Sequence, residues 1–403
     1  MNPITRLFSE PHRLYFSAAA LSLIAAMLWW GHYLSLRFKW AFDYKTGPLP
    51  IHGFGLMYGG FSLFALGFLF TAFPRWMGSV EHLAKAYWGP FWCLAPGWIL
   101  YFTQLWTGEP WGRIGAFMLF AGHLWAWAHL LRLFKLGTSE ERRQPTFILI
   151  ALGGGVLGSL AAFLYQLYQL PIFYRMGLGV GLYFFWPGLI LSLFWRLLPF
   201  FTNSRNPGWA LSSWPPALPL WALGLFLKTW AYVFEVQEYW LISDSLLLCV
   251  TLFQFYQWQV WRPKSGGWIL GFLYQAILWF PLALGLHLAY AWGRFMGEVE
   301  AHLEMAGLHA LTLGLMASLL FGLVPRVSYG HSGRPVQASW WLVLGFQLVQ
   351  LAALSRVGLE LALTQYDPAL PLLWVPVAFW LLALLPWALR FLTIYFKPRA
   401  DEI

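Results

Sequence analysis

The sequence predicts an all-helical integral membrane protein that crosses the bilayer many times. Of its 403 residues, 60% are hydrophobic and 20% are aromatic, while only 10% are charged. This balance excludes an ordinary soluble enzyme. Apolar runs of about 20 residues, the length with which a helix spans a bilayer, recur from end to end. Because the connections between them leave no room for a folded soluble domain, one integral membrane domain over residues 1–403 is expected.

Twelve transmembrane helices are expected, each on one apolar run. The first run follows the charged stretch Arg6–Arg13 and is too long for the apolar region of a cleavable signal peptide. In chain order, the expected helices lie near residues 13–36, 51–77, 83–105, 110–136, 146–169, 176–201, 214–238, 240–261, 267–292, 299–328, 337–363 and 370–397.

The distribution of charge predicts the orientation. With the N-terminus inside, the inner side collects most of the 25 Lys and Arg residues, as the positive-inside rule requires. The outer side receives most of the acids, Asp244 among them. Both termini are therefore expected in the cytoplasm. This bias explains the formal charge of +9, so lipid is the expected surrounding and no nucleic acid partner is indicated.

Two cysteines limit the redox chemistry. Cys93 and Cys249 lie in separate apolar runs, and the chain has no C-x-x-C-H motif for covalent haem attachment. Two cysteines also cannot hold a four-cysteine iron–sulfur cluster. Any redox centre must be held by His, Met, Glu or Tyr.

Histidines gather in the predicted outer half of the membrane. An imidazole inside a bilayer is costly, and metal or haem ligation and proton handling are common reasons for it. Together these histidines indicate a metal or haem site open to the outer face, although each alone could be a hydrogen-bonded packing residue. They are His32, His52, His287, His302 and His309.

The second expected helix carries a bare side. Glycines recur at positions 53, 55, 59, 60 and 67. Small residues let helices approach closely, and they also make room for a planar macrocycle. Both interpretations remain open.

The tenth expected helix carries the sharpest local pattern. His302, Met305 and His309 follow a spacing of three and four, which places them on one stripe. The two histidines are about 10 Å apart along the axis, so they would serve two centres rather than one ion. The alternative is a polar stripe that lines helix contacts.

Three stretches resemble the NnrS family of bacterial membrane proteins. The segment HALTLGLMASLLFGLVPRVSYGHSGRPV at 309–336 is similar to a family segment that begins with His and ends in a G-H-T-G-R-P turn. GFLFTAFPRWMG at 67–78 and RLLPFFTNSR at 196–205 resemble two further family motifs. The residues that match family positions are His52, Arg196, Pro199, His309, Arg326, His331 and Arg334. Where many members read H-x-H-E-M, this chain reads HGFGL at 52–56, so a centre that relies on the missing His and Glu must be ligated differently.

The resemblance implies a protein of the bacterial cytoplasmic membrane that contains haem and copper and acts in nitric oxide metabolism or resistance to nitrosative stress. A weaker likeness links the chain to subunit I of haem–copper oxidases and nitric oxide reductases. That family needs histidines in its sixth and seventh helices, and this chain has none there.

These observations lead to a specific expectation for the site. His52 and His309 are expected to bind the iron of a non-covalent haem b from opposite faces, and Arg356 to neutralise a haem propionate. A second metal, copper with a His/Met set or non-haem iron with a His/Glu set, is expected on α-helical side chains in the outer half. The candidate ligands are His302, Glu304 and Met305, with His287 or His32.

Nitric oxide is the expected ligand, and whether the chain reduces it, as an oxidoreductase would, is left open. A reductase would need an electron donor at the outer face, either quinol or a cytochrome that docks on Glu298, Glu300 and Glu304. Two other classes remain. One is a non-redox transporter that uses Lys228, Glu235, His123 and Gln166; the other is a haem-bearing sensor or assembly factor.

The turn Gly330–Arg334 is expected on the inner side, after the tenth helix. Its backbone N–H groups and its arginine would suit an anion or a lipid headgroup.

Overall fold

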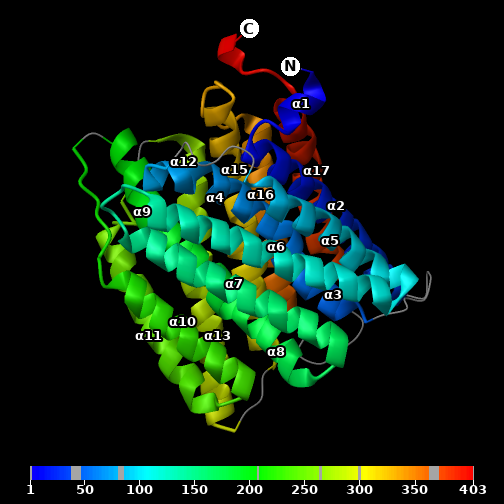
Figure 1. Ribbon diagram of the computed structural model, residues 1–403. Helices are drawn as coiled ribbons and strands as arrows, with labels where there is room; N and C mark the ends of the chain where they lie inside the picture. The colour runs from blue at the N-terminus through cyan, green and yellow to red at the C-terminus, as the bar shows by residue number, and fades with distance from the viewer. Residues whose placement is uncertain are drawn as a thin grey trace. The chain divides into compact units, whose positions relative to one another are not determined.

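The computed structural model describes residues 2–37, 47–79, 86–206, 208–262, 266–297, 301–362 and 372–402. Every regular element in these residues is helical, which confirms the all-helical part of the predicted fold class (Figure 1). Glu298 and Glu300 lie outside the described residues. The α-helices are α1 (Pro3–Leu7), α2 (Pro11–Arg37), α3 (Pro48–Gly55), α4 (Phe61–Met77), α5 (Trp88–Thr107), α6 (Glu109–Leu136), α7 (Arg143–Tyr168), α8 (Pro171–Val180), α9 (Trp186–Arg205), α10 (Ala217–Phe234), α11 (Gln237–Gln257), α12 (Gly267–Ile277), α13 (Trp279–Phe295), α14 (Ala301–His309), α15 (Ser318–His331), α16 (Trp340–Ala362) and α17 (Trp374–Phe396).

Each of the twelve expected segments contains helix. Within the described ranges, 11 helical runs are long and apolar enough to cross a membrane. Neither the short α1 nor α5, which lies on the third expected segment, is among them. The chain is thus helical and polytopic, while the count of twelve spans and the cytoplasmic position of the termini stay predictions.

Three of the long runs are interrupted by π-helical turns. These are η1 (Leu56–Gly60) between α3 and α4, η3 (Gly181–Phe185) between α8 and α9, and η4 (Ala310–Ala317) between α14 and α15. A π-turn is rare and is found frequently at functional sites. A short 3₁₀ turn, η6 (Ala400–Glu402), follows α17.

The chain divides into two compact units. Unit 1 comprises residues 1–186, 327–334 and 388–403, and unit 2 comprises residues 187–326 and 335–387. The expectation of one domain over residues 1–403 stays a prediction.

Close helix approach through glycine organises unit 1. A Cβ at Gly97 of α5 would lie 3.2 Å from the carbonyl oxygen of Gly115 in α6, and a Cβ at Gly115 would strike the backbone of Tyr101. Since a side chain fits at neither position, α5 and α6 pack backbone to backbone, as membrane helices with small residues do.

A buried chain of hydrogen bonds ties three helices of unit 2 together. The indole N–H of Trp279 (α13) donates to Gln350 Oε1 (α16) over 2.8 Å. Gln350 Nε2 donates in turn to Ser318 Oγ (α15) over 2.6 Å. The glycine at position 314 leaves room for the Trp279 ring against η4. These contacts position α13, α15 and α16, which carry or flank the candidate site of unit 2.

Candidate functional site

His309 ends α14 in unit 2, directly before η4 begins. Its Nδ1 lies 2.8 Å from the carbonyl oxygen of Met305. Because a carbonyl oxygen only accepts, the proton belongs on Nδ1 and the lone pair on Nε2. Histidines that bind a metal through one nitrogen commonly donate the other N–H to a carbonyl in this way. The geometry therefore suits ligation through Nε2.

Arg356 lies beside this histidine, and Glu360 joins the two. The guanidinium of Arg356 pairs with Glu360 Oε1 one turn further along α16, and the same oxygen is 4.0 Å from His309 Nδ1. Arg356 Nη1 is buried and has no hydrogen-bond partner within the described ranges. The structure thus brings together two of the three residues expected to bind haem. Sequence analysis missed Glu360, although its position four residues after Arg356 was a signal for an ion pair.

A second cluster of charges is buried in unit 2. Lys228 Nζ (α10) donates to the two carboxylate oxygens of Asp244 (α11) over 2.6 and 2.8 Å. The side chains are 2% and 0% exposed. The ammonium also lies 4.7 Å from the centroid of the Trp240 ring. Asp244, counted above among the acids of the outer side, is paired and buried inside α11, and its side of the membrane stays a prediction.

His287 and Glu304 adjoin this charged cluster. The His287 ring of α13 lies where a side chain at Gly307 of α14 would otherwise be. Glu304 interacts electrostatically with Lys228 and shares a hydrogen bond with Tyr290.

The other expected ligands of a second metal are less buried than His287. His302 is half-buried and Met305 is 38% exposed, and His32 belongs to unit 1. No group of three or more His, Cys, Asp or Glu side chains in the part of the chain that the structure describes is placed to hold a metal ion. The second metal stays a prediction.

His52 is half-buried in unit 1, four residues before η1 begins. Its ring stacks on Trp30 of α2, with 3.9 Å between the centroids and 27° between the planes. The bare side of this helical run is filled by neighbours. Trp98 occupies the space that a Cβ at Gly59 would need, and Tyr15 and Phe16 do the same at position 67. Close helix packing therefore accounts for Gly59 and Gly67.

His123 is a satisfied packing residue. Its ring is buried, with Nδ1 2.8 Å from the Leu119 carbonyl oxygen and Nε2 2.9 Å from Ser62 Oγ. Gln166, another member of the set expected for a transporter, donates to Tyr101 Oη over 3.2 Å. Both residues belong to unit 1, whereas Lys228 belongs to unit 2.

The fold and these buried polar groups define a polytopic α-helical membrane protein. The sequence profile of the family described as NnrS protein matches residues 6–399. The chain therefore belongs to the NnrS family, as its three motifs predict. No curated protein matches it.

Proposed function

We propose that this chain is a haem b protein of the bacterial cytoplasmic membrane that acts in nitric oxide metabolism or resistance to nitrosative stress. Membership of the NnrS family fits a membrane protein linked to nitric oxide. The observation that carries the haem part of the proposal is the arrangement of His309, Glu360 and Arg356 in unit 2.

The donor set of this arrangement fits a haem. His309 is held in the tautomer that ligates through Nε2. Arg356 Nη1 is a buried donor without a partner among the described residues, and leaving such a group unsatisfied is costly. A propionate carboxylate would satisfy it. When bound, the haem would supply an iron centre that coordinates nitric oxide.

The π-turns give independent support. One begins four residues after His52 and another begins directly after His309. A π-turn shifts the register of the side chains that follow it, and such turns recur at functional sites. That His52 and His309 hold one iron stays a prediction, as do a copper or non-haem iron and an electron donor at the outer face.

Spectroscopy of the purified protein tests the proposal. Protein produced with an adequate haem supply should give a pyridine haemochrome spectrum of the b type, and nitric oxide should shift the spectrum of the reduced form. His309→Ala should remove or convert the native spectrum, and His129→Ala, which changes a half-buried histidine of α6, should leave it intact. A folded, colourless wild-type preparation would contradict the proposal.

The Lys228–Asp244 pair favours a second candidate function, a transporter without redox chemistry. Ionisable residues buried in membrane helices commonly mark a substrate or ion path, and both members of this pair are almost fully buried. This alternative would be supported if proteoliposomes that contain the protein take up a solute without haem, and if the Lys228→Met variant abolishes that uptake. A nitric oxide electrode separates the haem-bearing possibilities, because an enzyme consumes nitric oxide continuously and a sensor binds it once.

A further inference from the structure

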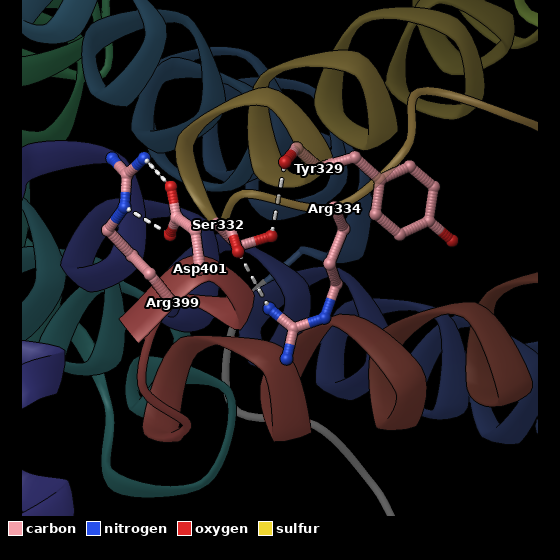
Figure 2. A network of polar contacts seen from close by, with 5 residues as sticks. All are labelled: Tyr329, Ser332, Arg334, Arg399 and Asp401. Atoms are coloured by element: carbon pink, nitrogen blue, oxygen red, sulfur yellow. Dashed lines mark hydrogen bonds and ion pairs between the residues drawn. The ribbon is translucent and has the colours of Figure 1, made fainter. Parts of the chain in front are cut away.

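The family turn Gly330–Arg334 is held by the C-terminal segment of unit 1. The backbone N–H of Ala400 donates to the Ser332 carbonyl oxygen over 2.9 Å. Gly333 has a φ of +66°, and a Cβ there would meet the Asp401 carboxylate, with 2.5 Å to Oδ1 and 3.2 Å to Oδ2. Figure 2 shows Arg399 and Asp401 beside the turn that carries Ser332 and Arg334. A carboxylate thus already lies against this turn.

Two histidines face each other next to this contact. His12 of α2 and His331 of the turn have ring centroids 4.8 Å apart. His12 is only 2% exposed, and its Nδ1 has no hydrogen-bond partner within the described residues. Burying an imidazole nitrogen without a hydrogen bond is costly. A ligand that accepts or donates a hydrogen bond at Nδ1 would remove this cost.

The surroundings of this pair are cationic. Arg13, Arg75 and Arg399 all act electrostatically on His331. Arg13 donates to the carbonyl oxygens of Tyr395 and Lys397 over 3.0 and 3.1 Å. These carbonyl groups lie at the C-terminal end of α17, where the helix dipole is negative. They position the guanidinium, and because they are uncharged they do not neutralise it.

One carboxylate offsets part of this charge. Arg399 pairs with Asp401 over 3.0 and 2.7 Å, and this hydrogen bonding lowers the pKa of the Asp401 carboxyl below its ordinary value. The side chain is therefore an anion at neutral pH. The guanidinium of Arg75 is exposed and makes no ion pair with any residue that the structure describes. The charge of Arg75 is therefore not offset by a carboxylate of the residues that the structure describes.

We propose that His12, His331 and Arg75 form a binding site for a phosphate-bearing anion, with the Asp401 carboxylate as an internal competitor. An imidazole N–H and a guanidinium both donate to phosphate oxygens, and hydrogen bonds between charged partners are the stronger kind. The neighbouring arginines disfavour a metal cation at the same histidines. The anion is a phosphate group, supplied either by a phospholipid headgroup or by free phosphate.

Binding to the full-length protein in detergent tests the site. Native mass spectrometry would measure retained phosphatidylglycerol, and the shift of the thermal unfolding midpoint with added inorganic phosphate would measure free anion. Arg75→Gln should weaken binding by about tenfold, the loss expected for one hydrogen bond to a charged group. Asp401→Asn should strengthen binding, because it removes the competing charge. Arg132→Gln, which changes another exposed arginine of the same unit, is the matched control and should bind as the wild type does.

The lipid-retention and inorganic-phosphate measurements together also identify the source of the phosphate. Retention of phosphatidylglycerol without a response to inorganic phosphate supports a headgroup site, and a response to inorganic phosphate in delipidated protein supports a site for free phosphate. Equal losses in Arg75→Gln and Arg132→Gln would overturn the proposal, because binding would then follow general surface charge. Binding of Zn²⁺ or copper that His12→Asn abolishes, with no effect of either anion, would overturn it in favour of a metal pair.

Discussion

The Lys228–Asp244 ion pair shows how a charged side chain can be buried inside unit 2. A charge moved out of water loses several kcal/mol of solvation, and only a close counter-charge with good geometry offsets this cost. The two short contacts to the carboxylate and the Trp240 ring beside the ammonium provide that compensation. Arg356 meets the same cost in part, because its charge is paired with Glu360 while its Nη1 donor stays buried without a hydrogen bond to any described residue.

Removing one partner of the buried pair should destabilise the protein more than removing both. Asp244→Asn leaves the buried ammonium without its carboxylate, and Lys228→Met leaves the carboxylate without its ammonium. Each should lower the free energy of unfolding by about 3–5 kcal/mol. The double variant Lys228→Met/Asp244→Leu should cost less than either single change, and therefore clearly less than their sum. Denaturant unfolding in detergent measures this cycle, and strictly additive losses would show that the pair is not coupled.

At the scale of elements, glycine decides how closely the helices of unit 1 approach. Gly59 lies in η1, where the five-residue π-turn and the Trp98 ring of α5 meet. A π-turn is less favourable than the α-helix that it interrupts, so it persists only where packing holds it. The packing of the Trp98 ring directly against Gly59 is a contact of this kind.

Gly59→Ala should therefore destabilise the protein through steric overlap. Forcing a methyl group into a filled space typically costs about 1–3 kcal/mol, and here the atom in the way belongs to a bulky ring of a neighbouring helix. Gly285→Ala is the matched control, since a Cβ at that helical position meets nothing within 4 Å. Thermal unfolding of the two variants measures the difference. A Gly59→Ala protein as stable as Gly285→Ala would mean that Trp98 moves aside freely.

At the scale of the whole molecule, alternation of helices across a bilayer determines which loops share a side. The described residues contain 11 runs suited to span a membrane, together with α5. Whether α5 also spans decides the side of every loop after it. The basic bias of the sequence fits twelve crossings with both ends inside.

Cysteine accessibility can establish this topology. In a variant with Cys93 and Cys249 replaced by Ala, a single cysteine introduced at the exposed Glu140 should react with a membrane-impermeant maleimide only from the cytoplasmic side. A second variant with a cysteine at exposed Thr107, the last residue of α5 and two residues before α6 begins, should react only from outside. Labelling of both from the same side would show that α6 does not cross the membrane.

The amino-acid sequence by itself determined the helical class and the family, and each of the twelve apolar runs that it marks contains helix. The reason is that a lipid-embedded backbone must satisfy its own hydrogen bonds, so a long apolar run has essentially one fold available to it. The sequence also pointed to His309 and Arg356, because a polar residue in an apolar run stands out whatever surrounds it.

Only the tertiary structure decided what those polar residues contact. Three contacts depend on which helices face each other. They are the ion pair of Lys228 with Asp244, the hydrogen bond that Gln350 accepts from the Trp279 indole N–H, and the position of Glu360 next to both His309 and Arg356. The π-turns beside His52 and His309 were equally hidden, because one added residue in a helical turn leaves no mark in hydrophobic periodicity. Such partners are brought together by packing between distant segments, and a pattern along one helix carries no record of the helix opposite.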